Sequence, residues 1–149
     1  MPRQDRQVKA VPPAGGKSVR TGGDPDSANS KLPVWSIKYF DHDGPWGRHL
    51  CDKDDALWAC IFVKLRHYES RTWAEITQNK KRDHPVSVDG LTKEARKRLT
   101  DLGLDDIESL FRLRLDGTQR VWGIRDREVF RLLWWDPDHE ICESHLRNT

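Results

Sequence analysis

The residues best suited to chemistry are arginines and histidines in the C-terminal half of the chain. Arg112 and Arg114 alternate with apolar residues, so an extended chain presents both on one side. Arg120 and Arg125 stand at the two ends of a second apolar segment, and His139 follows further along. A guanidinium group carries a fixed positive charge that suits phosphate. Imidazole titrates near neutral pH and suits proton transfer.

Charge is unevenly distributed along the chain. The net charge is +2 over 149 residues, but residues 80–100 carry +4 and residues 101–149 carry −4. The strip begins with Lys80, Lys81 and Arg82, followed shortly by His84. A globally basic nucleic-acid binder is therefore not indicated, whereas a local basic strip beside an acidic C-terminal third is.

The C-terminal arginines fall in segments with the two-residue period of β-strands. Strands are expected at 110–116, 120–125 and 129–135. Asp116-Gly117 and Asp126-Arg127 are turn signals between them. The sequence therefore predicts an antiparallel meander of three or four strands.

The preceding part of the chain predicts one strand followed by helices. The strand is expected at 34–40, and helices at 52–68, from Thr72 onward and at 91–102. A brief strand is expected at 86–88. Helices packed on one face of an antiparallel sheet give an α+β domain.

Residues 1–33 have a different composition from the rest. They hold five of the eight prolines and four of the ten glycines, with few large aliphatic residues. We expect a disordered, weakly basic tail, because this stretch cannot bury enough surface to offset its ordering entropy. Residues 34–149 are then one domain. The chain has no apolar run long enough for a membrane span, so no membrane partner is expected.

Cysteine usage favours a reducing compartment. Three cysteines without a secretory signal argue for free thiols in the cytoplasm. A zinc site would need Cys142 and His145 to recruit Cys51 or a distant histidine. His42, Asp43 and His49 are metal-like, but the glycines around them explain that stretch as a turn. We expect no metal and no cofactor.

The element order and the segment Leu113-Arg114-Leu115-Asp116-Gly117-Thr118-Gln119-Arg120-Val121-Trp122-Gly123-Ile124-Arg125 together resemble the RelE/ParE superfamily of bacterial toxins. The likeness covers about residues 34–145. It implies a RelE-like fold and a separate antitoxin chain as partner. RelE-like toxins cut mRNA on the ribosome by activating the ribose 2′-hydroxyl, without a metal, whereas ParE-like toxins act on DNA gyrase.

The resemblance also assigns roles to residues. Arg120 and Arg125 match the arginine positions of the family and would stabilise the reacting phosphate. His139 would be the acid or base, with His84 as a second proton-transfer candidate. Flanking phosphates would be bound by Arg112 and Arg114. The RNA backbone would be held by Lys80, Lys81 and Arg82.

Other interpretations of the same residues remain open. Carboxylates on neighbouring strands would neutralise the arginines if they form a solvated face. His139 follows Asp136-Pro137-Asp138, which also suits a turn or cap. The chain has seven tryptophans, and Trp46 with one of Trp134 or Trp135 could be exposed. The alternative function is a non-catalytic protein-interaction module with a surface rich in arginine and tryptophan. A DNA-binding accessory protein is a third interpretation.

Overall fold

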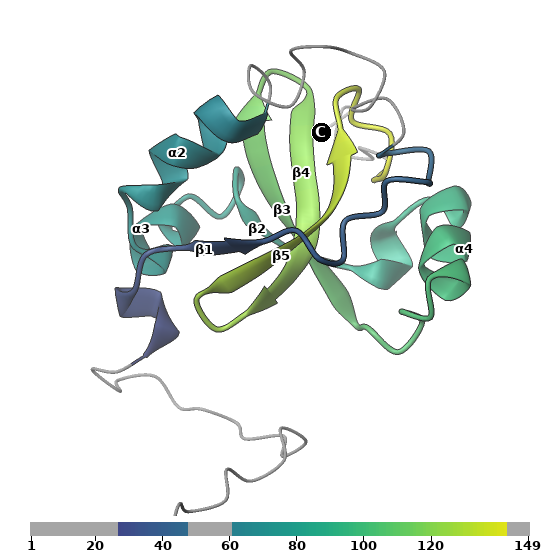
Figure 1. Ribbon diagram of the computed structural model, residues 1–149, viewed down its shortest axis with the longest axis horizontal. Coiled ribbons are helices and arrows are strands. Elements are labelled where there is room, and N and C mark those ends of the chain that lie inside the picture. Colours follow the sequence, from purple (N-terminus) through teal and green to yellow (C-terminus); the bar gives the residue numbers. More distant parts are fainter. Residues whose placement is uncertain (1–26, 48–60, 143–149) are drawn as a thin grey trace, which may run out of the picture.

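The computed structural model describes residues 27–47 and 61–142. These residues form a mainly antiparallel five-stranded sheet with the strand order β1-β5-β4-β3-β2. Helices lie on both sides of the sheet (Figure 1). The architecture is α+β, as the sequence predicted.

The predicted C-terminal meander is confirmed. It consists of β3 (Ser109–Asp116), β4 (Gln119–Asp126) and β5 (Val129–Asp136). Gly117, with φ +48°, and Arg127, with φ +59°, occupy the left-handed region in the two connecting turns. Such turns match the twist of paired strands, which is why Asp-Gly is a hairpin signal.

Two short strands flank the meander. At one edge, β1 (Val34–Ser36) runs parallel to β5, and at the other, β2 (His84–Ser87) runs antiparallel to β3. The strand predicted at 34–40 ends early because the chain turns after Ser36, where the Phe40 amide bonds to the Ile37 carbonyl. The sheet therefore exceeds the predicted meander by one strand at each edge.

Three α-helices are described. They are α2 (Val63–Glu69), α3 (Trp73–Gln78) and α4 (Lys93–Asp101). The Thr72 hydroxyl accepts the Glu75 amide, and the Thr92 hydroxyl accepts the Ala95 amide. Each bond satisfies a donor that a helix start otherwise leaves open. Residues 52–60 of the predicted helix at 52–68 lie outside the described residues.

The expectation that all helices pack on one face is wrong. α2 and α3 bury Leu65, Tyr68, Trp73 and Ile76 against one face of the sheet. The other face is covered by α4, through Ala95 and Leu99, and by the loop that carries Trp46. Strands buried on both faces must be apolar on both, and β5 fits this rule because Arg131 is its one charged residue between Val129 and Trp135.

A bulge between β4 and β5 bends the sheet. The register shifts between Trp122 and Gly123, so that Trp122 faces Trp134 while Gly123 faces Leu132. A Cβ at Gly123 would lie 2.3 Å from the Arg131 carbonyl oxygen. Only glycine permits this close approach.

The boundary of the predicted tail is set too late. Ala28–Ser30 form a short 3-10 helix, and the Lys31 carbonyl accepts the Trp73 amide. One backbone hydrogen bond thus joins Lys31 to the start of α3, which composition alone does not reveal. Residues 1–26 of the tail lie outside the described residues. Within 27–47 and 61–142, no helix is long and apolar enough to cross a membrane.

Candidate functional site

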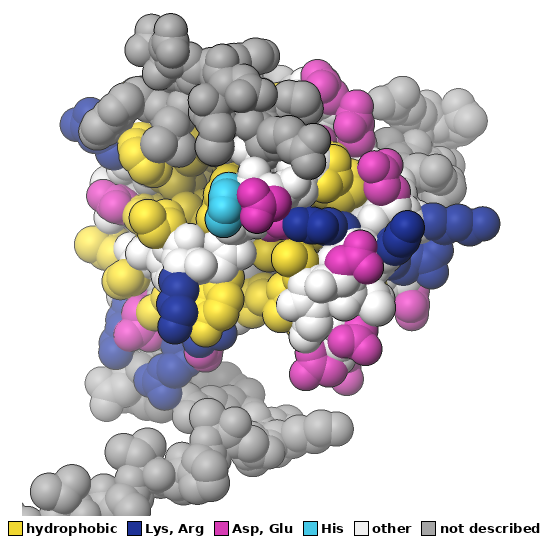
Figure 2. Space-filling view, turned by 45° about the vertical axis from the view of Figure 1, so that its right-hand side comes forward, with side chains coloured by type: hydrophobic (Ala, Val, Ile, Leu, Met, Phe, Trp, Pro, Cys, Tyr) yellow, Lys and Arg dark blue, Asp and Glu magenta, His cyan; other side chains and the backbone are white. Residues whose placement is uncertain are grey.

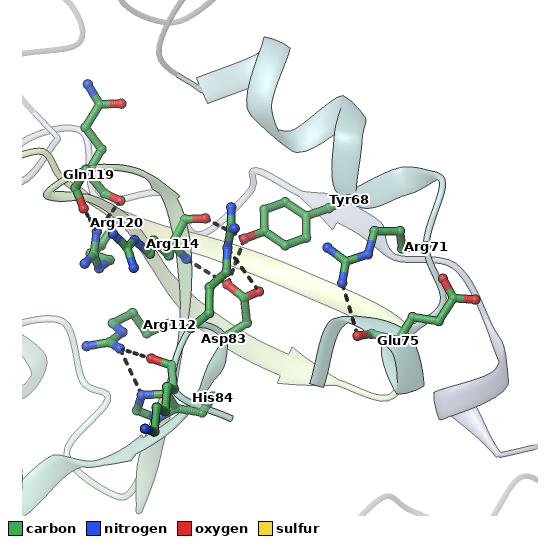
Figure 3. Close-up of polar contacts among 12 residues, drawn as sticks. Tyr68, Arg71, Glu75, Asp83, His84, Arg112, Arg114, Gln119 and Arg120 are labelled. Atoms are coloured by element: carbon green, nitrogen blue, oxygen red, sulfur yellow. Dashed lines mark hydrogen bonds and ion pairs between the residues drawn. The ribbon is translucent and has the colours of Figure 1, made fainter. Parts of the chain in front are cut away.

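Three predicted arginines lie on one face of the sheet. Arg114 on β3 stands directly opposite Arg120 on β4, and Arg112 precedes Arg114 by two residues on the same strand face. Figure 3 shows Arg114 and Arg120 close together, with Arg112 nearby beside His84. We call Arg112, Arg114 and Arg120 the arginine cluster.

No described carboxylate forms an ion pair with the arginine cluster. Asp136 faces Arg120 across the strands, but its oxygens accept the Glu140 and Ile141 amides at 2.8 and 3.1 Å. Arg120 instead donates to the carbonyls of Gly117 and Gln119. Asp136 therefore caps the turn after β5, and none of the carboxylates that the structure describes forms an ion pair with a guanidinium group of the cluster.

Burial makes this charge costly. Arg120 is only 9% exposed, and the Nε atoms of Arg112 and Arg120 are buried without a hydrogen-bond partner among the described residues. Burial lowers the pKa of both guanidinium groups, and repulsion from neighbouring arginines acts in the same direction. The charge of Asp136 opposes the shift for both groups, and that of Asp83 opposes it for Arg112. A buried cation without a carboxylate partner is a favourable place for an anion to bind.

Two imidazoles flank Arg112. Its Nη2 lies 2.9 Å from His84 Nε2, and its Nη1 lies 3.4 Å from His139 Nε2. A guanidinium group can only donate, so the Nε2 atom of each imidazole is the accepting atom in these contacts with Arg112. For His84 the assignment is supported independently, because Nδ1 lies 2.9 Å from the Pro85 carbonyl and must donate to it. Both histidines therefore present a lone pair toward the cluster.

The predicted basic turn also reaches the cluster. The Lys81 carbonyl accepts a bond from Arg112 Nη2, and the side chains of Lys80, Lys81 and Arg82 are exposed. The turn is anchored by Asp83, which is 1% exposed and accepts the Arg114 amide at 2.9 Å. The structure thus brings His84 and the Lys81 carbonyl to Arg112, while the side chains of the basic turn remain exposed.

Tyr68 and Asp83 form a support that the sequence did not indicate. The Tyr68 hydroxyl donates to Asp83 Oδ1 at 2.7 Å and contacts the Arg114 carbonyl. Burial and the Asp83 carboxylate raise the pKa of Tyr68 far above its usual range. Burial also raises the pKa of Asp83, although bonds from Tyr68 and Arg114 oppose the shift. No local pattern marks this pair, which brings together α2, the basic turn and β3.

Arg125 does not belong to the site, contrary to prediction. It follows Arg120 by five residues, and an odd separation places side chains on opposite faces of a strand. Its guanidinium lies 4.3 Å from the centre of the Trp73 ring and donates to the Asn29 side chain at 2.6 Å. Burial lowers the pKa of Arg125. Arg125 therefore fastens the N-terminal segment to α3 through a cation–π contact.

Carboxylates neutralise other arginines of the meander. Arg131 pairs with Asp126 at 3.2 Å, and Arg127 contacts Glu128 at 3.8 Å. The expectation of a neutralised face is confirmed for these two arginines. It is wrong for Arg112, Arg114 and Arg120 with respect to the carboxylates that the structure describes.

On the same face of the sheet as the cluster, one further arginine is fully paired. Arg98 on α4 donates from Nε and Nη2 to the two oxygens of Asp41, at 2.8 and 2.6 Å. Trp134 Nε1 donates to the same carboxylate at 3.0 Å. Burial alone would raise the pKa of Asp41, but the bonds from Arg98 and Trp134 outweigh it and hold the pKa below its usual value. We call Asp41, Arg98 and Trp134 the paired site.

Metal ligands and exposed tryptophans receive no support from the described part of the chain. No three His, Cys, Asp or Glu side chains there gather closely enough to hold a metal ion, and Cys51, His49 and His145 lie outside it. Trp46, Trp134 and Trp135 are buried. The prediction that some of these tryptophans are exposed is wrong, because the loop with Trp46 folds over the sheet and its ring packs 5.0 Å from that of Trp134.

Comparisons with protein-family models, with curated proteins and with solved structures each gave no match.

Proposed function

We propose that the protein binds RNA through the arginine cluster and cleaves it without a metal, as a toxin of the RelE/ParE-like type. One observation carries this proposal. Arg112, Arg114 and Arg120 share one face without a carboxylate ion-pair partner among the described residues, and two imidazoles adjoin Arg112. Phosphodiesters are anions that accept bidentate bonds from arginine.

The arrangement supplies the groups that transesterification requires. A phosphate bound to Arg112 would replace His84 and His139 as its acceptors, so that both Nε2 atoms become available. One imidazole then takes the proton of the 2′-hydroxyl as its oxygen attacks phosphorus. The other, in its protonated form, gives a proton to the departing 5′-oxygen. The products are a 2′,3′-cyclic phosphate and a free 5′-hydroxyl, and the arginines stabilise the charge on phosphorus.

The fold supports the resemblance at the level of element order. A strand, helices and an antiparallel meander follow one another as the resemblance implies. The helices of this pattern are α2, α3 and α4, and β2 lies between α3 and α4. Ribosome dependence and the antitoxin partner form part of this proposal and rest on the resemblance.

The decisive experiment measures RNA binding and cleavage by the purified protein. We expect single-stranded RNA to bind with an affinity that falls steeply with salt, because phosphate contacts release counterions. Cleavage should persist in EDTA and yield cyclic phosphate ends. His139→Ala should reduce the cleavage rate about 100-fold or more while RNA still binds.

A matched pair of variants tests the cluster. Arg112→Gln should weaken RNA binding, whereas Arg131→Gln, which removes a paired arginine from the same sheet, should not. Because RelE-like toxins cut mRNA on the ribosome, cleavage is also assayed with ribosome-bound mRNA. Absence of RNA binding, or equal losses in the two variants, would contradict the proposal.

A second candidate function, protein interaction, is favoured by an exposed apolar surface. Among the described residues, the large apolar side chains left exposed are those of Leu32, Val34, Ile37, Tyr39 and Val63. All except Val63 lie in β1 or next to it, at an edge of the sheet. Hydrophobic side chains visibly gather on the face shown in Figure 2. Exposed apolar residues on an edge strand favour pairing with another chain.

The partner that fits this edge is an extended apolar segment with acidic residues. Lys31 and Lys38 are exposed next to Leu32, Ile37 and Tyr39 in the chain, so acidic residues would complement the surface. In the toxin proposal, this segment belongs to the antitoxin. Ile37→Asp should abolish co-purification with a co-expressed antitoxin and leave RNA binding unchanged. If expression never arrests growth and RNA does not bind, interaction alone remains as the function.

A further inference from the structure

A second basic site lies on the other side of β3. Lys64 and His67 of α2, Arg71 after the helix, and Arg82 of the basic turn line a hollow of about 140 Å³ together with Tyr68 and Leu115. We call it the basic hollow. Figure 3 shows Tyr68 and Arg71 on the side of Asp83 away from Arg120. Nothing in the proposed cleavage reaction uses these side chains.

Positive charge exceeds negative charge in the basic hollow. Arg71 donates to a backbone carbonyl, that of Glu75, and makes no ion pair with a described carboxylate. Lys64 contacts Asp116 at 3.6 Å, but the Asp116 side chain is 71% exposed and the pair is weak. Asp83 lies beneath, with its Oδ2 buried and 3.9 Å from Arg82 Nε. An anion that enters would meet several cations and few competing carboxylates.

The basic hollow and the arginine cluster are joined by one turn. The backbone carbonyl of Lys81 accepts a hydrogen bond from Arg112 of the cluster. The next residue, Arg82, lines the hollow. β2 pairs with β3 only as far as Arg112, and beyond it the Arg114 amide bonds to the Asp83 side chain instead. The edge of β3 between the two sites is therefore not covered by a further strand of the described chain.

We infer that the basic hollow is a second phosphate-binding site, which holds a neighbouring phosphate of the same single-stranded RNA that occupies the arginine cluster. The RNA strand passes around the end of β3 at the basic turn. The inference rests on the proposed RNA binding. It specifies a substrate longer than the reacting dinucleotide, because the cluster and the hollow lie on opposite sides of β3. A rigid duplex would not follow this edge, whereas a flexible single strand can.

The test compares substitutions at two positions, Arg71 and Arg66. Arg71→Gln should weaken the binding of a long single-stranded RNA about fivefold and reduce the slope of log affinity against log salt by about 0.7, the value for one lost contact to a single strand. The same substitution should leave binding of a dinucleotide unchanged. Arg71→Lys keeps the charge and should restore the slope. Arg66→Gln, an exposed arginine of α2 that does not line the hollow, is the control and should behave as wild type.

The outcomes separate this inference from the proposal beneath it. If wild type and Arg66→Gln bind RNA, Arg112→Gln does not, and Arg71→Gln matches wild type in affinity and slope, the second site is refuted and the first stands. If wild type binds no RNA, both fall. If Arg71→Gln and Arg71→Lys lose RNA affinity equally and both have lowered thermal stability, Arg71 has a structural role and the second site is refuted.

Discussion

The paired site and the arginine cluster place the same residue type on the same face of the sheet in opposite electrostatic settings. In the paired site, Asp41 receives two bonds from Arg98 and one from Trp134. Bonding to Asp41 raises the pKa of Arg98, whereas burial lowers that of Arg112 and Arg120. The bonded pair of Arg98 and Asp41 stabilises the fold. The buried charges of the arginine cluster lower the free energy of unfolding, and a bound anion would raise it again.

The comparison shows what distinguishes a structural from a functional arginine. Arg98 fixes the loop at 41–47 to α4, and its partner is an acid that is 5% exposed. Arg112 and Arg120 bond to neutral carbonyls and imidazoles, which orient a guanidinium without cancelling its charge. Orientation without neutralisation is the condition for binding an external anion.

The largest effect is expected when the paired site is broken. Asp41→Ala leaves a partly buried Arg98 and the Trp134 donor without their acceptor. The free energy of unfolding should fall by about 3 kcal/mol. Urea unfolding followed by tryptophan fluorescence measures the loss. Asp43→Ala, in the same loop but exposed, should change stability little, and an equal loss in both variants would contradict the assignment.

A change of pH is expected to have a smaller effect on stability. The effect has opposite signs for the two buried carboxylates, Asp41 and Asp83. The pKa of Asp41 is lowered in the folded state, so its ionised form stabilises the fold above the unfolded-state value near 4, and this stabilisation is lost as the pH falls through the folded-state pKa. The pKa of Asp83 is raised, so its contribution becomes more favourable as the pH falls through that raised value. The free energy of unfolding of Asp41→Asn and of Asp83→Asn is measured at several pH values. Its difference from wild type should change with pH in opposite directions for the two variants. Slopes of the same sign would refute the contrast.

The smallest effect on stability is expected in the cluster itself. Arg120→Met removes a buried cation that two other arginines repel and replaces it with an apolar side chain of similar length. Stability should change by less than about 1 kcal/mol in either direction. Arg98→Met, which leaves Asp41 without its cation, should cost more. Thermal unfolding of the two variants measures the difference, and a larger loss for Arg120→Met would reverse the comparison.

Much of the architecture follows from local patterns. The alternation of Phe111, Leu113 and Leu115 with charged residues sets the face of β3, and Asp116-Gly117 sets the turn after it. The shared face of Arg112 and Arg114 follows from the same period. Placing Arg125 on the opposite face from Arg120 required only counting the residues between them, but the resemblance had assigned both to one site.

Other features depend on contacts between distant segments. Asp41 lies 57 residues before Arg98 and 93 before Trp134, and no local spacing relates them. The same holds for Tyr68 and Asp83, and for the burial of Trp46, Trp134 and Trp135. Several carboxylates follow the meander arginines in the sequence, but Asp126 and Glu128 form ion pairs while Asp136 caps a turn.

The sequence by itself determined the α+β class, the meander and the residue types that can bind phosphate, because strand period and turn chemistry are properties of neighbouring residues. Only the tertiary structure decided which arginines form no ion pair with a carboxylate in the described part of the chain. That outcome depends on the partner that each charge meets across the sheet and on how much water the packing excludes. Charge neutralisation is a relation between segments far apart in the chain, and it is set when they pack together.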